Sequence, residues 1–149
     1  MLQMNTVDAP VRMGRSTGAD EPGRNLRRRW TVITILLAST FFLEAVFAGA
    51  MLSGSSWARG AHAATAMVLV ASTFAAGLLG LFTLRRFQHG RRLGLTLLSL
   101  SAAAFVQAAL GSLSAKGANL TWIHVPLGVA LVTLSGLAAL SARRLDGSR

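Results

Sequence analysis

The sequence predicts an all-α protein: a bundle of four transmembrane helices built from two repeated helical hairpins. Of its 149 residues, 52% are hydrophobic and only 13% are charged, whereas a soluble domain has about 25% charged residues. The arginines gather in three clusters that bracket four apolar runs, and a short motif occurs twice. This composition excludes a soluble enzyme domain and, over most of the length, intrinsic disorder. There are no cysteines, which excludes disulfides and thiol chemistry.

Residues 1–25 combine prolines, glycines and scattered charges without hydrophobic periodicity. We expect a flexible cytoplasmic tail here, either solvated or serving as a docking arm for another subunit or for anionic lipid headgroups. The transmembrane domain is expected over residues 26–145.

The predicted transmembrane helices cover about residues 30–52, 61–84, 93–114 and 120–142. Each has about 22 residues, which is enough to cross about 30 Å of hydrocarbon as an α-helix. The first run is too long for the hydrophobic part of a signal peptide and follows a long polar segment. We expect Trp30 at the inner membrane interface, and Trp57 and Trp122 at the outer one, because tryptophan is enriched at these depths.

The arginine clusters also predict the orientation of the chain. They are Arg24, Arg27, Arg28 and Arg29; then Arg85, Arg86, Arg91 and Arg92; and finally Arg143, Arg144 and Arg149. By the positive-inside rule, both termini and the connection between the second and third helices face the cytoplasm. Proteins that bind nucleic acid instead distribute basic residues along one face. The formal net charge of +10 therefore indicates membrane topology, and we expect no nucleic-acid partner.

A repeated motif relates the two predicted hairpins. Phe-Leu-Glu-Ala at residues 42–45 corresponds to Phe-Val-Gln-Ala at residues 105–108, and a histidine follows each copy at nearly the same distance, His62 and His124. Parallel repeats of this kind generate a pseudo-two-fold axis along the membrane normal. The two histidines are therefore expected on the same side of the membrane, on different helices and facing one another.

Two neutral imidazoles on facing helices are suitable axial ligands for a haem iron. A small residue follows each histidine by one helical turn on the same face and would leave space for the flat macrocycle. The two cations of the outer loops are candidate partners for the haem propionates. The predicted cofactor-binding residues are His62, His124, Ala66, Gly128, Arg59 and Lys116, of which the two histidines bind the metal. The alternative is that Ala66 and Gly128 only allow close helix packing.

Glu44 is the only acid in the predicted transmembrane helices. An intramembrane carboxylate costs about 2.5–3.5 kcal/mol and indicates function by default. Three roles are open: orienting a histidine, relaying protons to a quinone or another redox partner, or making a hydrogen-bonded helix contact. Its repeat equivalent, Gln107, cannot titrate, which favours a hydrogen-bonding role shared by both positions.

The four helices, the His62–His124 spacing and the segment Gln-Ala-Ala-Leu-Gly at residues 107–111 ahead of His124 resemble one half of haem A synthase, over about residues 30–142. In that family each half is a four-helix bundle with a histidine pair near the outer face, and one half holds a b-type haem. The resemblance therefore implies haem b at His62 and His124. The chain is also similar to small four-helix bacterial membrane proteins, which implies the inner (cytoplasmic) membrane of a bacterial cell.

The chain also departs from that family. It has one half instead of two and no cysteine pair, and Glu44 is on the helix before the histidine rather than on the same helix. Oxidation of the haem methyl group is therefore not implied, and we predict no catalytic residue.

The expected function is that of an integral membrane b-type cytochrome, bound to one haem for electron transfer or as a subunit of a redox complex. The alternative is a cofactor-free accessory subunit of a larger respiratory or photosynthetic membrane complex. A small transporter or channel is the weakest interpretation, because the transmembrane helices contain a single acid. The expected partners are the lipid bilayer, other membrane subunits and a quinone.

Overall fold

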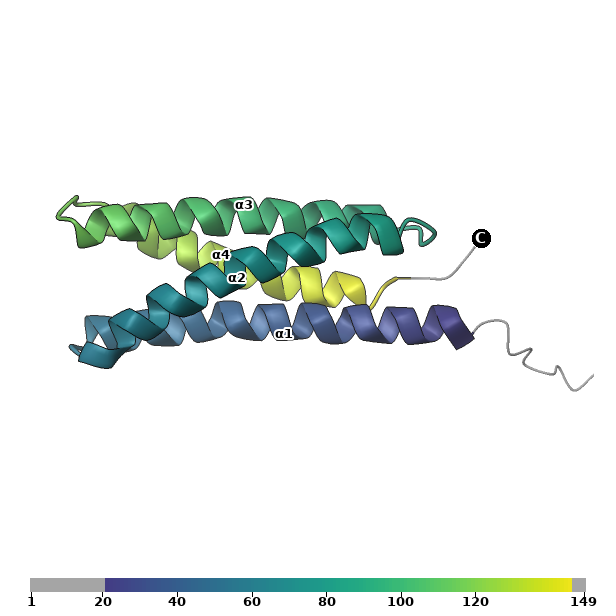
Figure 1. The fold of residues 1–149 in the computed structure, drawn as a ribbon, viewed down its shortest axis with the longest axis horizontal. Coiled ribbons are helices and arrows are strands. Elements are labelled where there is room, and N and C mark those ends of the chain that lie inside the picture. Colours follow the sequence, from purple (N-terminus) through teal and green to yellow (C-terminus); the bar gives the residue numbers. More distant parts are fainter. Residues whose placement is uncertain (1–20, 146–149) are drawn as a thin grey trace, which may run out of the picture.

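The computed structural model describes residues 21–145. The helices are α1 (Glu21–Leu52), α2 (Ser56–Thr83), α3 (Gly90–Ala115) and α4 (Thr121–Ala142). They pack lengthwise into one elongated bundle (Figure 1). All four are long and apolar enough to cross a membrane, and large apolar side chains such as Phe42, Met67 and Phe105 are exposed on their sides. The four-helix transmembrane bundle predicted from the sequence is therefore confirmed.

Two helices begin at least five residues earlier than predicted. Helix α1 begins at Glu21, so residues 21–25 are helical although they were assigned to the flexible tail; an acid is favourable at a helix N-terminus and proline is tolerated in the first turn. The rest of the predicted tail, residues 1–20, lies outside the described residues. Helix α2 begins at Ser56, which places Arg59 in the first turn of a helix and not in a loop.

The two hairpins turn in the same way. Gly54 and Gly117 have φ angles of 89° and 100°, a left-handed conformation that glycine adopts without the steric cost of a Cβ. The amide of Gly54 donates to the carbonyl of Met51, and the amide of Gly117 donates to that of Ser114. The same turn thus ends the first helix of each hairpin, in agreement with the sequence repeat.

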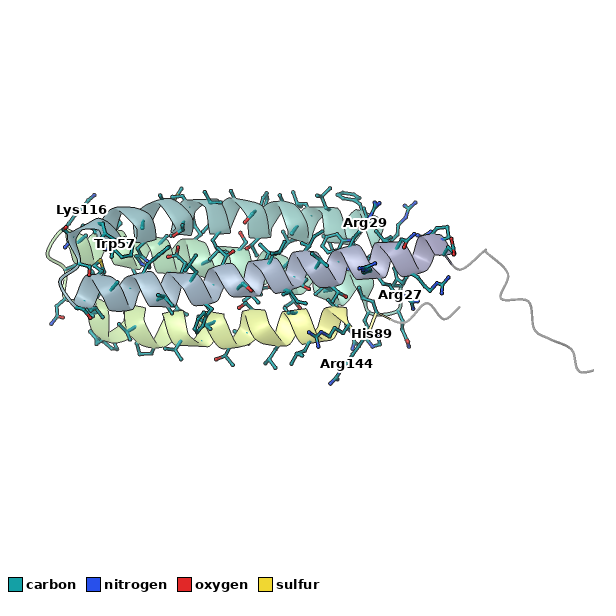
Figure 2. The ribbon with its side chains drawn as sticks, turned by 90° about the horizontal axis from the view of Figure 1, so that it is seen from below. Arg27, Arg29, Trp57, His89, Lys116 and Arg144 are labelled. Atoms are coloured by element: carbon teal, nitrogen blue, oxygen red, sulfur yellow. The ribbon has the colours of Figure 1, made fainter. Side chains whose placement is uncertain are left out.

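We call the end of the bundle with these two turns the histidine end, because His62 and His124 lie near it. The opposite end, the arginine end, is formed by the start of α1, the α2–α3 connection and the end of α4. Figure 2 shows Arg27, Arg29, His89 and Arg144 together at the arginine end, with Trp57 and Lys116 at the histidine end.

Helices α2 and α4 slant in opposite directions across the bundle (Figure 1). Near the histidine end, contacts join α1 to α2 and α3 to α4. Near the arginine end, contacts instead join α2 to α3 and α1 to α4. A Cβ on Gly80 of α2 would lie 3.3 Å from the Cα of Gly94 on α3. The guanidinium of Arg27 on α1 donates to the carbonyl of Leu145, just after α4. No Cα of α2 lies within 8 Å of one in α4, so these two helices are diagonally opposite.

Trp30 is part of the core of the bundle and does not lie on its outer surface, where a tryptophan of the membrane interface contacts lipid. Only 4% of it is exposed, because Gly80 has no side chain and leaves space for the indole ring; a Cβ there would lie 3.3 Å from Cη2 of Trp30. Trp57 and Trp122 are exposed, as expected for residues at an interface.

Candidate functional site

The structure brings the two repeated histidines together. The imidazole rings of His62 and His124 have centroids 6.5 Å apart and planes at 87° to each other. His62 is on α2 and His124 is on α4, the two helices that are diagonally opposite. The rings therefore face one another across the interior of the bundle, as the repeat predicted.

Glu44 contacts the ring of His62. Oε2 of the carboxylate lies 2.6 Å from Nδ1 of the imidazole, within ion-pair distance, although the ring N–H is not aligned for a regular hydrogen bond. Glu44 is buried, with 9% of its surface exposed. A carboxylate at Nδ1 restricts the orientation of the ring and leaves Nε2 to bind a ligand. Among the three roles considered for Glu44, this contact favours orienting the histidine.

The other carboxylate oxygen of Glu44 is bound by Thr65. The hydroxyl of Thr65 donates to Oε1 of Glu44 and also lies 2.7 Å from the carbonyl oxygen of Ala61. It has one proton and donates to one acceptor at a time. Thr65 was not among the predicted site residues; its position three residues after His62, on the same face of the helix, was the available signal.

The second hairpin holds its histidine differently. The side-chain amide of Gln107 donates to the backbone carbonyl oxygen of His124 at 2.7 Å, and not to the ring. Gly111, one turn further along α3, lies against the imidazole: a Cβ at this position would be 2.9 Å from Cε1 of His124. Because glycine has no Cβ, the ring fits between α3 and α4. This role of Gly111 is not among those predicted from the sequence.

The space predicted for a macrocycle beside Gly128 is filled by protein. A Cβ on Gly128 would lie 3.0 Å from Nε2 of Gln107, so the glycine makes room for this amide. Ala66, the equivalent residue after His62, is half-buried. Arg59 and Lys116 are exposed and are not enclosed beside the two imidazoles.

Buried polar atoms without a regular hydrogen bond concentrate at this level of the bundle. In residues 21–145 they are Oε2 of Glu44, Nδ1 of His62, Oε1 of Gln107, Nδ1 of His124, Oγ of Ser114 and Oγ1 of Thr73. Four of these six atoms belong to the repeated motif residues; Oε2 of Glu44 and Nδ1 of His62 contact each other, which leaves Oε1 of Gln107 and Nδ1 of His124 without a polar contact. Protein interiors leave few such atoms, and each one requires an explanation. Convergent polar groups inside an apolar structure are typical of a ligand site.

Comparison with protein-family models, with curated proteins and with solved structures finds no match to this chain. The geometry of the site is therefore the basis on which a function can be assigned.

Proposed function

We propose that the protein is a b-type haem protein of the membrane, in which His62 and His124 would hold the haem. The observation that supports this proposal is the pair of imidazoles facing each other from diagonal helices, with centroids 6.5 Å apart. No group of three or more His, Cys, Asp or Glu side chains in residues 21–145 could hold a metal ion. A bare zinc ion needs at least three protein ligands, whereas a porphyrin supplies its own four nitrogens and needs only axial ones.

The spacing of the rings is consistent with this assignment. Each imidazole would bind the iron through a ring nitrogen, and the centroid distance of 6.5 Å is short enough for two metal–nitrogen bonds of about 2 Å. The contact of Glu44 with Nδ1 of His62 also leaves the correct nitrogen, Nε2, for the metal.

Haem binding would require the side chain of Gln107 to move. The amide of Gln107 lies against Gly128, in the space predicted from the sequence for the macrocycle. Binding therefore requires the Gln107 side chain to move away from α4 and to give up its hydrogen bond to the carbonyl of His124. The haem would supply one-electron transfer, while the chain's own residues bind it, orient His62 and exclude water.

The inner membrane of a bacterial cell is the location that the resemblance to small bacterial membrane proteins implies, and the arginine clusters support an orientation with both termini cytoplasmic. The histidine end then faces outward, and His62 and His124 lie near that surface. An electron donor or acceptor would reach the site from the outer side, as a quinone dissolved in the bilayer or as another membrane subunit.

A second candidate function is a cofactor-free accessory subunit of a larger respiratory or photosynthetic membrane complex. The packing at Gly111 and Gly128 favours this function, because protein side chains fill the space at both glycines. The His124 ring lies at Gly111, and the Gln107 amide lies at Gly128. In this case the polar residues specify how the hairpins pair, and the exposed apolar sides contact other subunits.

An absorption spectrum distinguishes the two functions. The full chain, purified from haem-replete cells, should show a Soret band and a reducible alpha band of low-spin haem. His62→Ala and His124→Ala should each abolish the low-spin spectrum, because low-spin iron here needs both imidazoles. His89→Ala is the matched control, since His89 is exposed at the other end of the bundle, and its spectrum should equal that of the parent. A colourless parent protein would replace the haem proposal with the accessory-subunit function.

A further inference from the structure

A hollow of about 460 Å³ lies between α1 and the end of α4 at the arginine end. It is lined by Arg27, Arg28, Thr31, Ala142, Arg143, Arg144 and Leu145. The two sides of the hollow are more than 100 residues apart in the sequence, and the hydrogen bond from Arg27 to the carbonyl oxygen of Leu145 holds them together. The folded bundle, and not a local sequence cluster, thus creates this concentration of arginines.

The hollow combines a basic rim with an apolar floor. Four of its residues are arginines, and none of its described lining residues is acidic; Asp146, the next residue in the sequence, lies outside the described residues. Arg28, Arg143 and Arg144 are exposed. Ala142 and Leu145 are buried, with 1% and 2% of their surfaces exposed. Guanidinium groups bind phosphate oxygens in a bidentate manner, so the exposed arginines are suited to a phosphate group.

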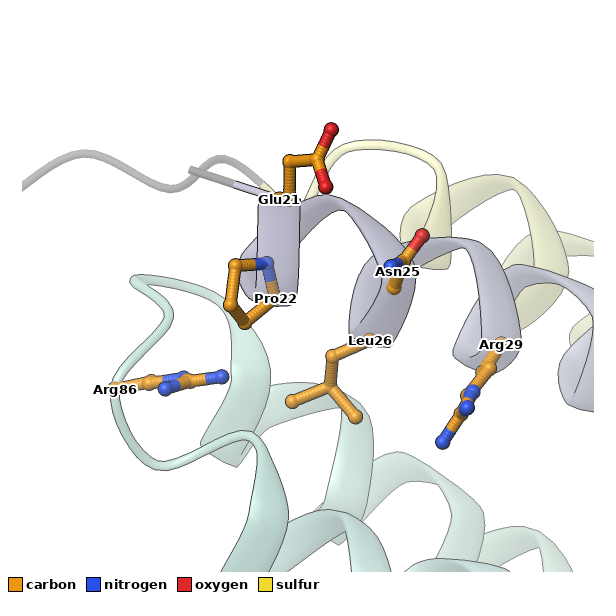
Figure 3. A pocket seen from close by; sticks show the side chains of 6 residues that line it. All are labelled: Glu21, Pro22, Asn25, Leu26, Arg29 and Arg86. Carbon is orange, nitrogen blue, oxygen red and sulfur yellow. The ribbon is translucent and has the colours of Figure 1, made fainter. Parts of the chain in front are cut away.

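A second hollow at the same end provides a comparison. It has a volume of about 520 Å³ and lies where the first turns of α1 meet the α2–α3 connection. Figure 3 shows its two arginines, Arg29 and Arg86, on either side of Leu26, with Glu21 nearby. With two arginines and one carboxylate, this hollow attracts an anion less strongly than the hollow between α1 and α4.

We propose that the hollow between α1 and α4 binds the headgroup phosphate of an anionic phospholipid. The hollow lies where the apolar parts of α1 and α4 end, and this is the depth at which headgroups lie in a bilayer. Basic hollows between transmembrane helices at the cytoplasmic side are suited to anionic headgroups. The acyl chains of a lipid hold its phosphate at this depth, whereas inorganic phosphate has no such anchor. This site is independent of the haem proposal, because it lies at the opposite end of the bundle.

Native mass spectrometry of the full chain in detergent, titrated with phosphatidylglycerol, tests the proposal. The parent should bind phosphatidylglycerol in preference to zwitterionic phosphatidylcholine. The double variant Arg143→Gln, Arg144→Gln should bind phosphatidylglycerol about 150-fold more weakly, at about 1.5 kcal/mol for each lost hydrogen bond between a guanidinium and the phosphate. The matched control is Arg91→Gln, Arg92→Gln, which removes the same charge from the first turn of α3 at the same end of the bundle but outside both hollows. It should keep nearly the parental affinity.

Three results would overturn the proposal. Equal loss of binding in both double variants would show a diffuse attraction to the arginine end and no specific site. Equal binding of phosphatidylglycerol and phosphatidylcholine by the parent would show no preference for an anionic headgroup. Complete displacement of the lipid by inorganic phosphate at equal concentration would identify free phosphate as the ligand. Helical circular dichroism equal to that of the parent verifies that each variant is folded.

Discussion

The side-chain amide of Gln107 donates a hydrogen bond to the backbone carbonyl oxygen of His124, 2.7 Å away. At the equivalent place in the first hairpin, Glu44 contacts the imidazole ring of His62 instead. The ring of His124 is consequently held by packing against Gly111, and its Nδ1 is buried without a hydrogen bond. The carboxylate of Glu44 orients His62, whereas close packing against Gly111 orients His124.

Gly111→Ala should displace the imidazole of His124. The new Cβ would lie 2.9 Å from Cε1, closer than carbon atoms approach, and such overpacking costs about 1–3 kcal/mol. Thermal unfolding in detergent should show this loss, and a haem-loaded sample should lose its low-spin spectrum. Gly136→Ala is the control, because a Cβ there meets nothing within 4 Å and alanine favours the helix by about 0.5–1 kcal/mol. Equal stability of the two variants would show that Gly111 does not position the ring.

Glu44→Gln should have a small effect, whereas Glu44→Leu should be more damaging. Glutamine keeps an acceptor for the Thr65 hydroxyl and a polar group beside His62, whereas leucine leaves Nδ1 of His62 without a polar partner at a cost of about 1–3 kcal/mol. Unfolding in detergent of the parent and both variants measures the difference. If haem binds, redox titrations at several pH values should give equal slopes for the parent and Glu44→Gln. A slope that vanishes in Glu44→Gln would instead assign Glu44 to proton transfer.

Gly94→Ala should weaken the packing of α2 against α3. A Cβ at this position would lie 2.8 Å from the backbone nitrogen of Leu81, and backbone atoms yield less readily than the end of a flexible side chain. We expect a loss of about 1–3 kcal/mol in unfolding free energy, measured by titration of mixed micelles with a denaturing detergent. Gly49→Ala, on the lipid-exposed side of α1, adds the same methyl group with no neighbour within 4 Å and should be neutral or stabilising. The reverse order of stabilities would contradict the close α2–α3 contact.

Reporter fusions determine the orientation of the bundle. Fusions after Arg29, after Gln88 and at the carboxyl terminus should report the cytoplasm, because arginine-rich connections stay on that side. Fusions at Ser55 and Gly117, in the two turns of the histidine end, should report the outside. A cytoplasmic signal from either turn would contradict a bundle with four crossings.

The fold was predictable because a bilayer restricts the length and the flanking charges of each helix that crosses it. The length of an apolar run and the position of its flanking arginines determine where a chain crosses a membrane, and both can be counted in a sequence. The start of α1 was missed because hydropathy locates the bilayer and not the helix: residues 21–29 are helical although they are polar.

The meeting of His62 and His124 was also predictable, because the repeat places both at the same level. The packing around the two histidines was not predictable from the sequence. The burial of Trp30 depends on Gly80, 50 residues away in the sequence, and the filling of the space at Gly128 depends on the conformation of the Gln107 side chain. Tertiary packing determines these side-chain positions. Neither the hydropathy of a segment nor the spacing of its residues along the sequence contains this information.

Each hairpin contributes one imidazole, His62 from α2 and His124 from α4, so neither hairpin contains the pair. The two hairpins thus take the places that two copies occupy in a symmetric homodimer. In such a dimer, a substitution at one position changes both copies at once. A single polypeptide has no such restriction, and positions 44 and 107 differ, with a carboxylate in one hairpin and an amide in the other.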